Sequence, residues 1–171
     1  SAAEGRARAD IVVAGSAEDE INGALDRLGQ AGGGQLRLLG GRYELDGPVV
    51  LNAGGLALVG ESVGNGVGYS AAAIGSQLVP SDAFPDGEFL VRTTPDAYGP
   101  MVSLLHLDGL DRAQGLLVEG PRPTVSLNVV TQAGGAGMRF AGPSTGVRPY
   151  DGFVLFNPLF DGSGMGILHD G

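Results

Sequence analysis

The sequence predicts an all-β domain that coils as a solenoid behind one N-terminal helix. Glycine (32 residues) and proline (10) make up about a quarter of the 171 residues, and this load disfavours long helices. Similar segments recur in the later chain at intervals of about 22 residues, which is typical of stacked coils. The length and a hydrophobic fraction of 43% favour one ordered domain over residues 1–171.

The charge and residue types exclude several classes of partner. The net charge is −9, and the ten basic residues are all arginines that form no cluster, so we expect no nucleic-acid partner. Cysteine is absent, which excludes disulfides and thiolate metal sites. No run of about 18 apolar residues could span a bilayer, so we expect no membrane insertion. The first residues also lack the pattern of a secretion signal.

One amphipathic helix is predicted over residues 17–30. We divide the start of the chain into a lead-in strand, residues 1–15, and a capping helix with its glycine break, residues 16–34. Ser16 is a candidate N-cap, with Asp19 three residues later. Four apolar residues follow at helical spacing: Ile21, Ala24, Leu25 and Leu28. An open solenoid end exposes strand edges and core, and this helix is well placed to cover it.

Short strands follow the glycine break, within a region of β-helix rungs over residues 35–171. Four apolar segments separated by glycine-containing turns predict strands: residues 35–39, 43–45, 48–51 and 56–60. The Asp46-Gly47 pair could instead close a hairpin, which leaves antiparallel pairing open for this stretch.

The repeat favours parallel stacking in the later chain. A slide of 22 places superposes residues 105–107 on 127–129, and a further slide of 29 reaches 156–158. Each unit is too small to bury its own apolar face and needs a neighbour above and below. The alignment predicts a core layer of Leu105, Leu127 and Phe156. It also predicts a polar column, which would satisfy backbone groups, of His106, Asn128 and Asn157.

These segments resemble the pectate-lyase-like right-handed parallel β-helix superfamily. The segment AEDEINGALDRLGQAGGG stands in the place of its capping helix and glycine break, GRYEL in that of its G-T-Y-x-[LIV] motif, and LALVGES in that of x-L-x-G-x-G. The resemblance implies a single-stranded right-handed parallel β-helix of five or six rungs with an N-terminal amphipathic capping helix. Within the superfamily, the sequence of these segments is most similar to tailspike and minor tail proteins of phages of actinobacteria.

The resemblance also implies a function and partners. A phage tail protein of this kind sits in the virion tail and binds, and in some cases cleaves, host cell-surface polysaccharide. One alternative is a secreted, extracellular polysaccharide lyase or glycoside hydrolase, and another is a purely structural spacer. Phage spikes imply a homotrimer, which would cover a bare solenoid end. We expect no cofactor, apart from calcium if the protein is a lyase.

One compact cluster could carry chemistry, and it consists of Asp108, Asp111 and Arg112. A resemblance to pectate lyases would make the carboxylates calcium ligands and the arginine a base. A glycosidase needs two carboxylates about 5 to 9.5 Å apart, which Asp108 with Asp111, or either with Asp161, could supply. The paired aspartates and Gly-His-Gly of polygalacturonases are not found. The structural alternative is a turn in which aspartates accept backbone N–H groups.

Residues 63–99 depart from the repeat and predict an insertion on one flank of the solenoid, where binding surfaces commonly form. Its aromatic residues Tyr69, Phe84 and Tyr98 could stack on sugar rings. Together with Asp161 they form the predicted substrate-binding set. Ordinary loop packing is the alternative for all three aromatic residues.

Overall fold

The computed structural model describes residues 18–62, 75–141, 154–155, 159–161 and 165–170, with backbone alone from residue 154 onward. Within these ranges the chain forms one helix and fifteen strands. The predicted lead-in strand, residues 1–15, lies outside them. None of the described helices is long and apolar enough to cross a lipid bilayer.

The strands form three five-stranded sheets. The first contains β1 (Gly34–Leu38), β4 (Leu56–Gly60), β7 (Met101–Ser103), β10 (Thr124–Ser126) and β13 (Val154–Leu155). The second contains β2 (Gly41–Leu45), β5 (Ser76–Pro80), β8 (Leu105–Asp108), β11 (Val129–Thr131) and β14 (Leu159–Asp161). The third contains β3 (Val49–Leu51), β6 (Phe89–Thr93), β9 (Gln114–Val118), β12 (Ala136–Ala141) and β15 (Met165–Asp170).

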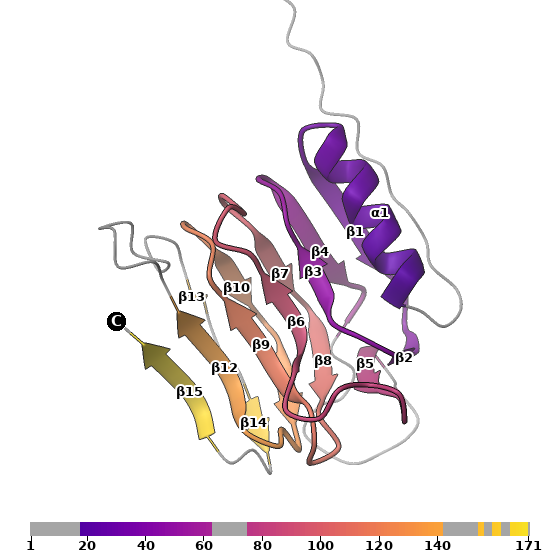
Figure 1. Ribbon diagram of the computed structural model, residues 1–171, viewed down its shortest axis with the longest axis vertical. Coiled ribbons are helices and arrows are strands. Elements are labelled where there is room, and N and C mark those ends of the chain that lie inside the picture. The colour runs from indigo at the N-terminus through magenta and orange to yellow at the C-terminus, as the bar shows by residue number, and fades with distance from the viewer. Residues whose placement is uncertain (1–17, 63–74, 142–153, 156–158, 162–164, 171) are drawn as a thin grey trace, which may run out of the picture.

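Each turn of the chain adds one strand to each sheet, and every neighbouring pair of strands is parallel. The fold is therefore a parallel β-helix of five described coils (Figure 1). The predicted fold class is confirmed. The hairpin alternative at Asp46-Gly47 is wrong, because β2 and β3 lie in different sheets and each pairs in parallel with the following coil.

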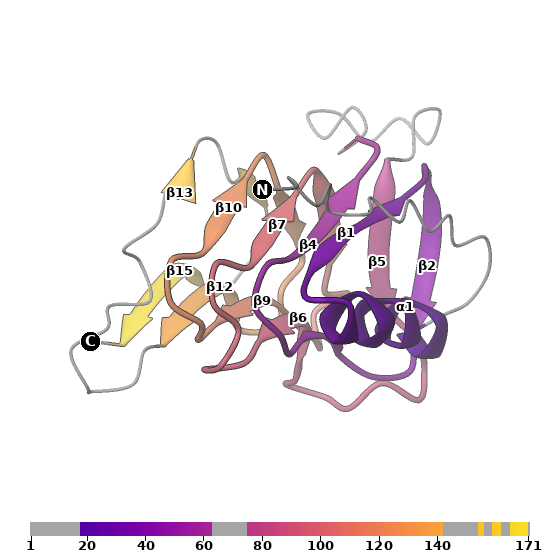
Figure 2. The same cartoon turned by 90° about the horizontal axis from the view of Figure 1, so that it is seen from above.

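The N-terminal helix α1 (Glu18–Gln30) packs against the first coil, as Figures 1 and 2 show. Its buried face consists of the four residues that the helical spacing predicted: Ile21, Ala24, Leu25 and Leu28. The four predicted strands match β1 to β4 within two residues at each end. Beneath the helix the core is a set of stacked columns. In one of them Leu36 pairs with Leu58, Leu58 with Val102, and Val102 with Val125.

The repeat of 22 residues is wrong by one place for residues 105–107. In β8 and β11 the register is 23, so His106 pairs with Val129 rather than Asn128. Between β9 and β12 the register returns to 22, because the turn after β8 holds one residue more than the turn after β11. Leu127 consequently lies at a corner with φ 53° and 50% exposure, outside the predicted core layer. Phe156 and Asn157 lie outside the described residues.

A column of buried corner residues does exist, and Asn128 belongs to it as predicted, whereas His106 does not. Ser76 pairs with Leu105, and the register places Asn128 next in line. The Asn128 amide accepts the Leu105 N–H (3.0 Å) and donates to the Val102 carbonyl (3.0 Å). Polar groups at this corner therefore satisfy buried backbone atoms, as expected of such a column.

Residues 63–99 are not one insertion on one flank. They contain β5 and β6, which are regular members of the second and third sheets. The second coil is long because its extra residues are divided among three connections between strands, from β4 to β5, from β5 to β6 and from β6 to β7.

Candidate functional site

Asp108, the first residue of the predicted catalytic cluster, ends β8. One of its carboxylate oxygens accepts the Gln77 side-chain amide (3.2 Å), and the other lies 3.4 Å from the Leu110 N–H. Asp111 follows in the turn, exposed and with φ 60°, and its N–H donates to the Gln132 carbonyl (2.7 Å). The backbone contact to Asp108 is the one that the turn interpretation expects.

Arg112 is directed to a different part of the molecule. Its guanidinium donates to the carbonyls of Ser81 and Phe84 (the latter at 3.4 Å) and lies 3.8 Å from the Asp86 carboxylate. In the described chain no ion pair joins it to Asp108 or Asp111. Arg112 thus holds the turn of residues 81–88, and a catalytic role for the three residues stays a prediction.

The predicted sugar-binding residues are scattered. Phe84 is only 3% exposed and belongs to the core, so its ring is not free to stack on a sugar. Tyr98 is 53% exposed, and the Arg122 guanidinium lies 5.6 Å from its ring centroid. Tyr69 lies outside the described residues. The backbone of Asp161 stands two coils beyond Asp108, as the repeat predicted, with Thr131 between them.

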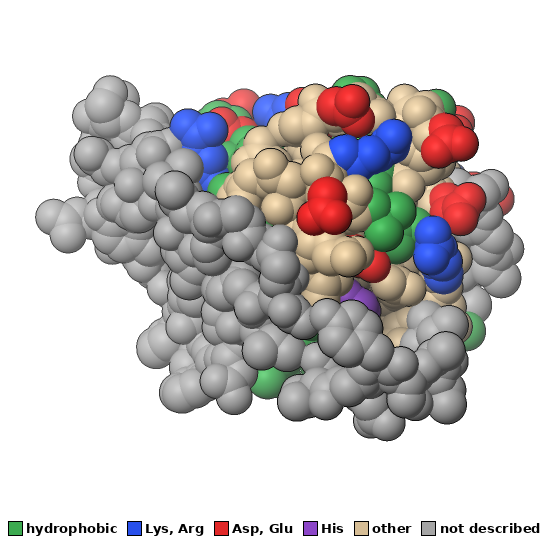
Figure 3. All heavy atoms as spheres, turned by 90° about the horizontal axis from the view of Figure 1, so that it is seen from below, with side chains coloured by type: hydrophobic (Ala, Val, Ile, Leu, Met, Phe, Trp, Pro, Cys, Tyr) green, Lys and Arg blue, Asp and Glu red, His purple; other side chains and the backbone are tan. Residues whose placement is uncertain are grey.

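The structure instead brings a set of polar residues together on the second sheet. Alternate residues of a strand point to opposite faces, and on β2, β5, β8 and β11 the inward set is apolar, apart from Ser76 at the corner, and buried. The polar members of the outward set, which we call the polar face, are Arg42, Glu44, Gln77, His106, Asp108 and Thr131, whereas Val79 and Val129 share the outward register but are buried. All six are half-buried or exposed. In Figure 3 acidic, basic and histidine side chains lie close together on one side of the molecule.

Two hydrogen bonds on the polar face repeat the same geometry. Gln77 donates to Asp108 (3.2 Å), and the His106 Nε2 atom lies 2.9 Å from the Thr131 hydroxyl. In each case the partner lies in the next coil, two residues beyond the position that is in register. Gln77 is in register with His106 but bonds Asp108, and Asp108 in turn is in register with Thr131, the partner of His106. The register of the β-helix therefore repeats this pairing once, and Val79 and Val129 occupy the outward positions where it would continue on either side.

The electrostatics of the polar face are those of a neutral to acidic surface. The Arg42 guanidinium lies 3.5 Å from the Glu44 carboxylate, which balances its charge. Burial lowers the pKa of His106, although Asp108 acts in the opposite direction. The imidazole is consequently neutral at pH 7. Among the described residues, no group of three or more histidine, aspartate or glutamate side chains is placed to hold a metal ion.

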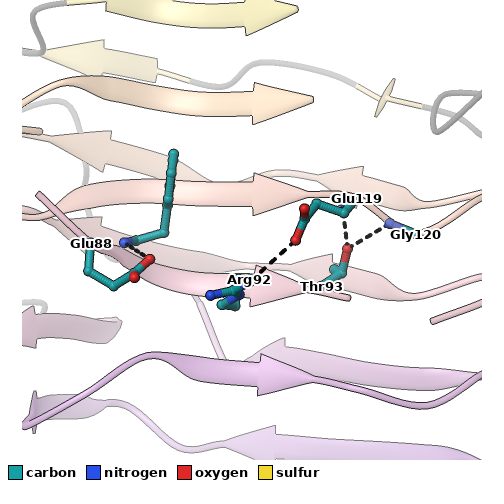
Figure 4. Close-up of polar contacts among 6 residues, drawn as sticks. Glu88, Arg92, Thr93, Glu119 and Gly120 are labelled. Carbon is teal, nitrogen blue, oxygen red and sulfur yellow. Dashed lines mark hydrogen bonds and ion pairs between the residues drawn. The ribbon is translucent and has the colours of Figure 1, made fainter. Parts of the chain in front are cut away.

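A second polar cluster, on the third sheet, is structural in character. The Thr93 hydroxyl accepts the N–H groups of Glu119 (2.9 Å) and Gly120 (3.1 Å), and Arg92 lies 3.5 Å from the Glu119 carboxylate (Figure 4). These contacts join β6 to the end of β9 in the next coil. They use the polar atoms for coil-to-coil bonds and present no repeated pattern to a ligand.

Comparison with known proteins gives one informative likeness. No family model matches the chain, and no curated protein matches it. The chain folds like part of a viral protein. ORF18 of Geobacillus virus E2 superposes with a TM-score of 0.55 at 16% sequence identity, over 70% of this chain and 23% of that one. The chain thus spans under a quarter of the viral protein, and at this identity the likeness concerns the fold alone.

Sequence reasoning missed Gln77 and Thr131, the two residues that complete the hydrogen-bonded pairs. The available signal was the alternation of polar and apolar residues in LHLD, whereas SQLV and VVT, which hold Gln77 and Thr131, do not alternate. That alternation places side chains on one face of a strand. It does not say which strands become neighbours.

Proposed function

We propose that this chain is the β-helix portion of a phage tail protein of the pectate-lyase-like superfamily, and that its polar face binds host cell-surface polysaccharide. The observation that carries the proposal is the repeated pair of hydrogen bonds, Gln77 with Asp108 and His106 with Thr131. The parallel β-helix and its likeness to a viral protein support the setting. In that setting the protein belongs to the virion and assembles as a homotrimer.

The chemistry of the face suits sugar hydroxyls, which both donate and accept hydrogen bonds. Gln77 supplies an amide, Asp108 a carboxylate acceptor and Thr131 a hydroxyl, while neutral His106 can donate or accept. Successive strands lie about 4.8 Å apart, so a glycan laid along the stack meets these two pairs one after the other, between Val79 and Val129 at the neighbouring outward positions. Binding along a repeating surface needs only modest energy from each pair.

The described geometry favours binding over cleavage. A lyase would need Arg112 free to act as a base, and this guanidinium is occupied by Ser81 and Phe84. The enzyme alternative and the spacer alternative are separated from the proposal by the experiment that follows.

The test measures binding of the purified chain to a polysaccharide panel by affinity electrophoresis, with parallel assays for reducing ends and unsaturated sugars. Thr131→Val removes a hydroxyl on the polar face and should weaken binding several-fold. Thr124→Val is the matched control, because Thr124 is a half-buried threonine on β10 in the first sheet. Product release abolished by Asp108→Asn would establish the enzyme alternative, and a lack of binding to every polysaccharide would leave the spacer.

A further inference from the structure

We infer that the polar face selects an uncharged, hydroxyl-rich glycan and rejects polysaccharides that carry uronate or sulfate groups. This inference rests on the proposed function, since it names the class of glycan for the same face. It follows from the charges and hydrogen-bonding groups that the register brings together.

The described part of the polar face offers no free cation to an anionic sugar. Arg42 is its single described arginine, and the guanidinium is paired with Glu44. Asp108 then leaves the face with a net negative charge. Recognition of carboxylate or sulfate groups in proteins generally uses unpaired arginine or lysine, and this face lacks both among its described residues.

Further acids flank the face at both ends of β2. Glu61 lies beside its start, where its carboxylate accepts the Gly40 N–H (2.8 Å). Asp46 follows its end and accepts the Ser81 hydroxyl. Because the whole chain carries a charge of −9, the long-range field also repels a polyanion. A uronate in contact with Asp108 would be disfavoured further by direct repulsion.

The net negative charge of the face would attract a cationic amino sugar, but its hydrogen-bonding groups favour neutral hydroxyls. Asp108 is the one acid within the hydrogen-bonded pairs, and Gln77 and Leu110 already donate to it. The remaining three members of the pairs, Gln77, His106 and Thr131, are uncharged at pH 7 and both donate and accept. An ammonium group can only donate, so it would use half of this capacity.

The experiment compares six polysaccharides with the full chain: dextran, mannan and galactan as neutral ligands, polygalacturonate and alginate as acidic ones, and chitosan as a cationic one. We expect binding to at least one neutral polysaccharide, and we expect that binding to change by less than about twofold between 50 and 500 mM NaCl, because no ion pair is formed.

A charge-removing variant provides the second arm. Asp108→Asn should raise binding of polygalacturonate at low salt by about fivefold or more, as expected for the loss of one close repulsion. The matched control is Asp96→Asn, which removes the same charge from an exposed position in the turn of residues 94–100. If Asp108→Asn does not fold, Glu44→Gln is the second variant: its side chain is 60% exposed, and the change removes one acid and frees the Arg42 guanidinium, so it should also raise binding of polygalacturonate.

The outcomes separate the inference from the proposed function. Tighter binding to an acidic polysaccharide or to chitosan than to every neutral one would overturn the inference and leave the function standing. An equal response of Asp108→Asn and Asp96→Asn would also overturn it, because the charge on the face would then be irrelevant. Failure of all six polysaccharides to bind would instead overturn the proposed function.

Discussion

Buried polar side chains hold the corner between the first and second sheets. The Ser76 hydroxyl accepts the Glu61 N–H (2.8 Å) and donates to the Leu38 carbonyl (2.8 Å). Asn128, two coils later, likewise bonds one backbone N–H and one carbonyl, both of them in the preceding coil. A buried backbone group without a partner costs about 1–3 kcal/mol. Small polar residues at this corner are therefore part of what keeps the coils in register.

Gly60, at the end of β4, has no room for a side chain. An added Cβ would overlap the Leu104 carbonyl oxygen and lie 2.9 Å from the Ser76 Cβ. We expect Gly60→Ala to lower the free energy of unfolding by about 1–3 kcal/mol, as overpacking generally does. Thermal melts followed by circular dichroism will measure this. Gly41→Ala is the control, because its Cβ would meet nothing nearer than Tyr43 at 3.9 Å, and equal melting temperatures would contradict the prediction.

His106 should make stability depend on pH. Burial lowers its pKa below the ordinary 6.5, so between the lowered value and 6.5 the unfolded chain binds more protons than the folded one. The stabilisation from neutral His106 is therefore present above about pH 6.5 and is lost as the pH falls below it. Urea unfolding at pH 7 and pH 5 should show a smaller loss of stability in His106→Gln than in the parent protein. Parallel profiles would refute this assignment.

The sequence located Asp108 at a strand end, but it could not show which residues Asp108 meets. Gln77 lies 31 residues before it, and the partners His106 and Thr131 are 25 residues apart. Such pairs depend on the number of residues in every intervening turn. A single additional residue after β8 was enough to move His106 from Asn128 to Val129, because one place of register exchanges the two faces of a strand.

The helix α1 acts on the first coil as an additional strand would. The Asn22 side chain donates to the Pro48 carbonyl (2.9 Å) and accepts the Val50 N–H (2.8 Å), which are backbone groups at the edge of β3. The helix thus covers apolar core and also satisfies part of an open sheet edge. Both effects oppose edge-to-edge association.

The turn of residues 81–88 depends on Arg112. Arg112→Gln removes the bonds to the carbonyls of Ser81 and Phe84, and hydrogen bonds from charged groups are worth about 1.5–3 kcal/mol each before solvent exposure reduces this. We expect the free energy of unfolding to fall by about 1–2 kcal/mol. We also expect faster hydrogen exchange at the Phe84 amide, which donates to the Ser81 carbonyl, and at the Gly87 amide, which donates to the Arg112 carbonyl. Asp111→Asn should change neither quantity. A fully protected turn in Arg112→Gln would show that the guanidinium is dispensable there.

The helix and the first four strands were predictable because local patterns determine them. Apolar residues at helical spacing mark α1, and short apolar segments between glycine turns mark β1 to β4. The strands β5 and β6 were missed because the second coil is much longer than the repeat, so no self-similarity marks them. Their assignment depends on parallel pairing with β2 and β3, which is non-local information.

In a stack of coils, side chains should be coupled energetically to those of the adjacent coils and not to those of distant coils. The core column of Leu36, Leu58, Val102 and Val125 provides a test, because adjacent members touch and the two ends are about 14 Å apart, three strand spacings. We expect Leu58→Ala and Val102→Ala to be non-additive in the free energy of unfolding, with a coupling of about 0.5 kcal/mol or more. Leu36→Ala and Val125→Ala should add within about 0.5 kcal/mol.

Urea titrations of the single and double variants measure both couplings. A strong coupling between Leu36 and Val125 would mean that the coils respond as one rigid body rather than through nearest neighbours, contrary to the usual behaviour of solenoids.

The number of residues along the chain between paired strands varies widely, while the pairing itself is unchanged. Gly34 pairs with Leu56 one coil later, only 22 places on, whereas Ala57 pairs with Met101 after 44. Additional chain is evidently accommodated at the corners while the ladders continue unchanged. For protein engineers, the exposed residues Asp82 and Ala83 in the connection between β5 and β6 are accordingly a natural place to graft a foreign peptide for display.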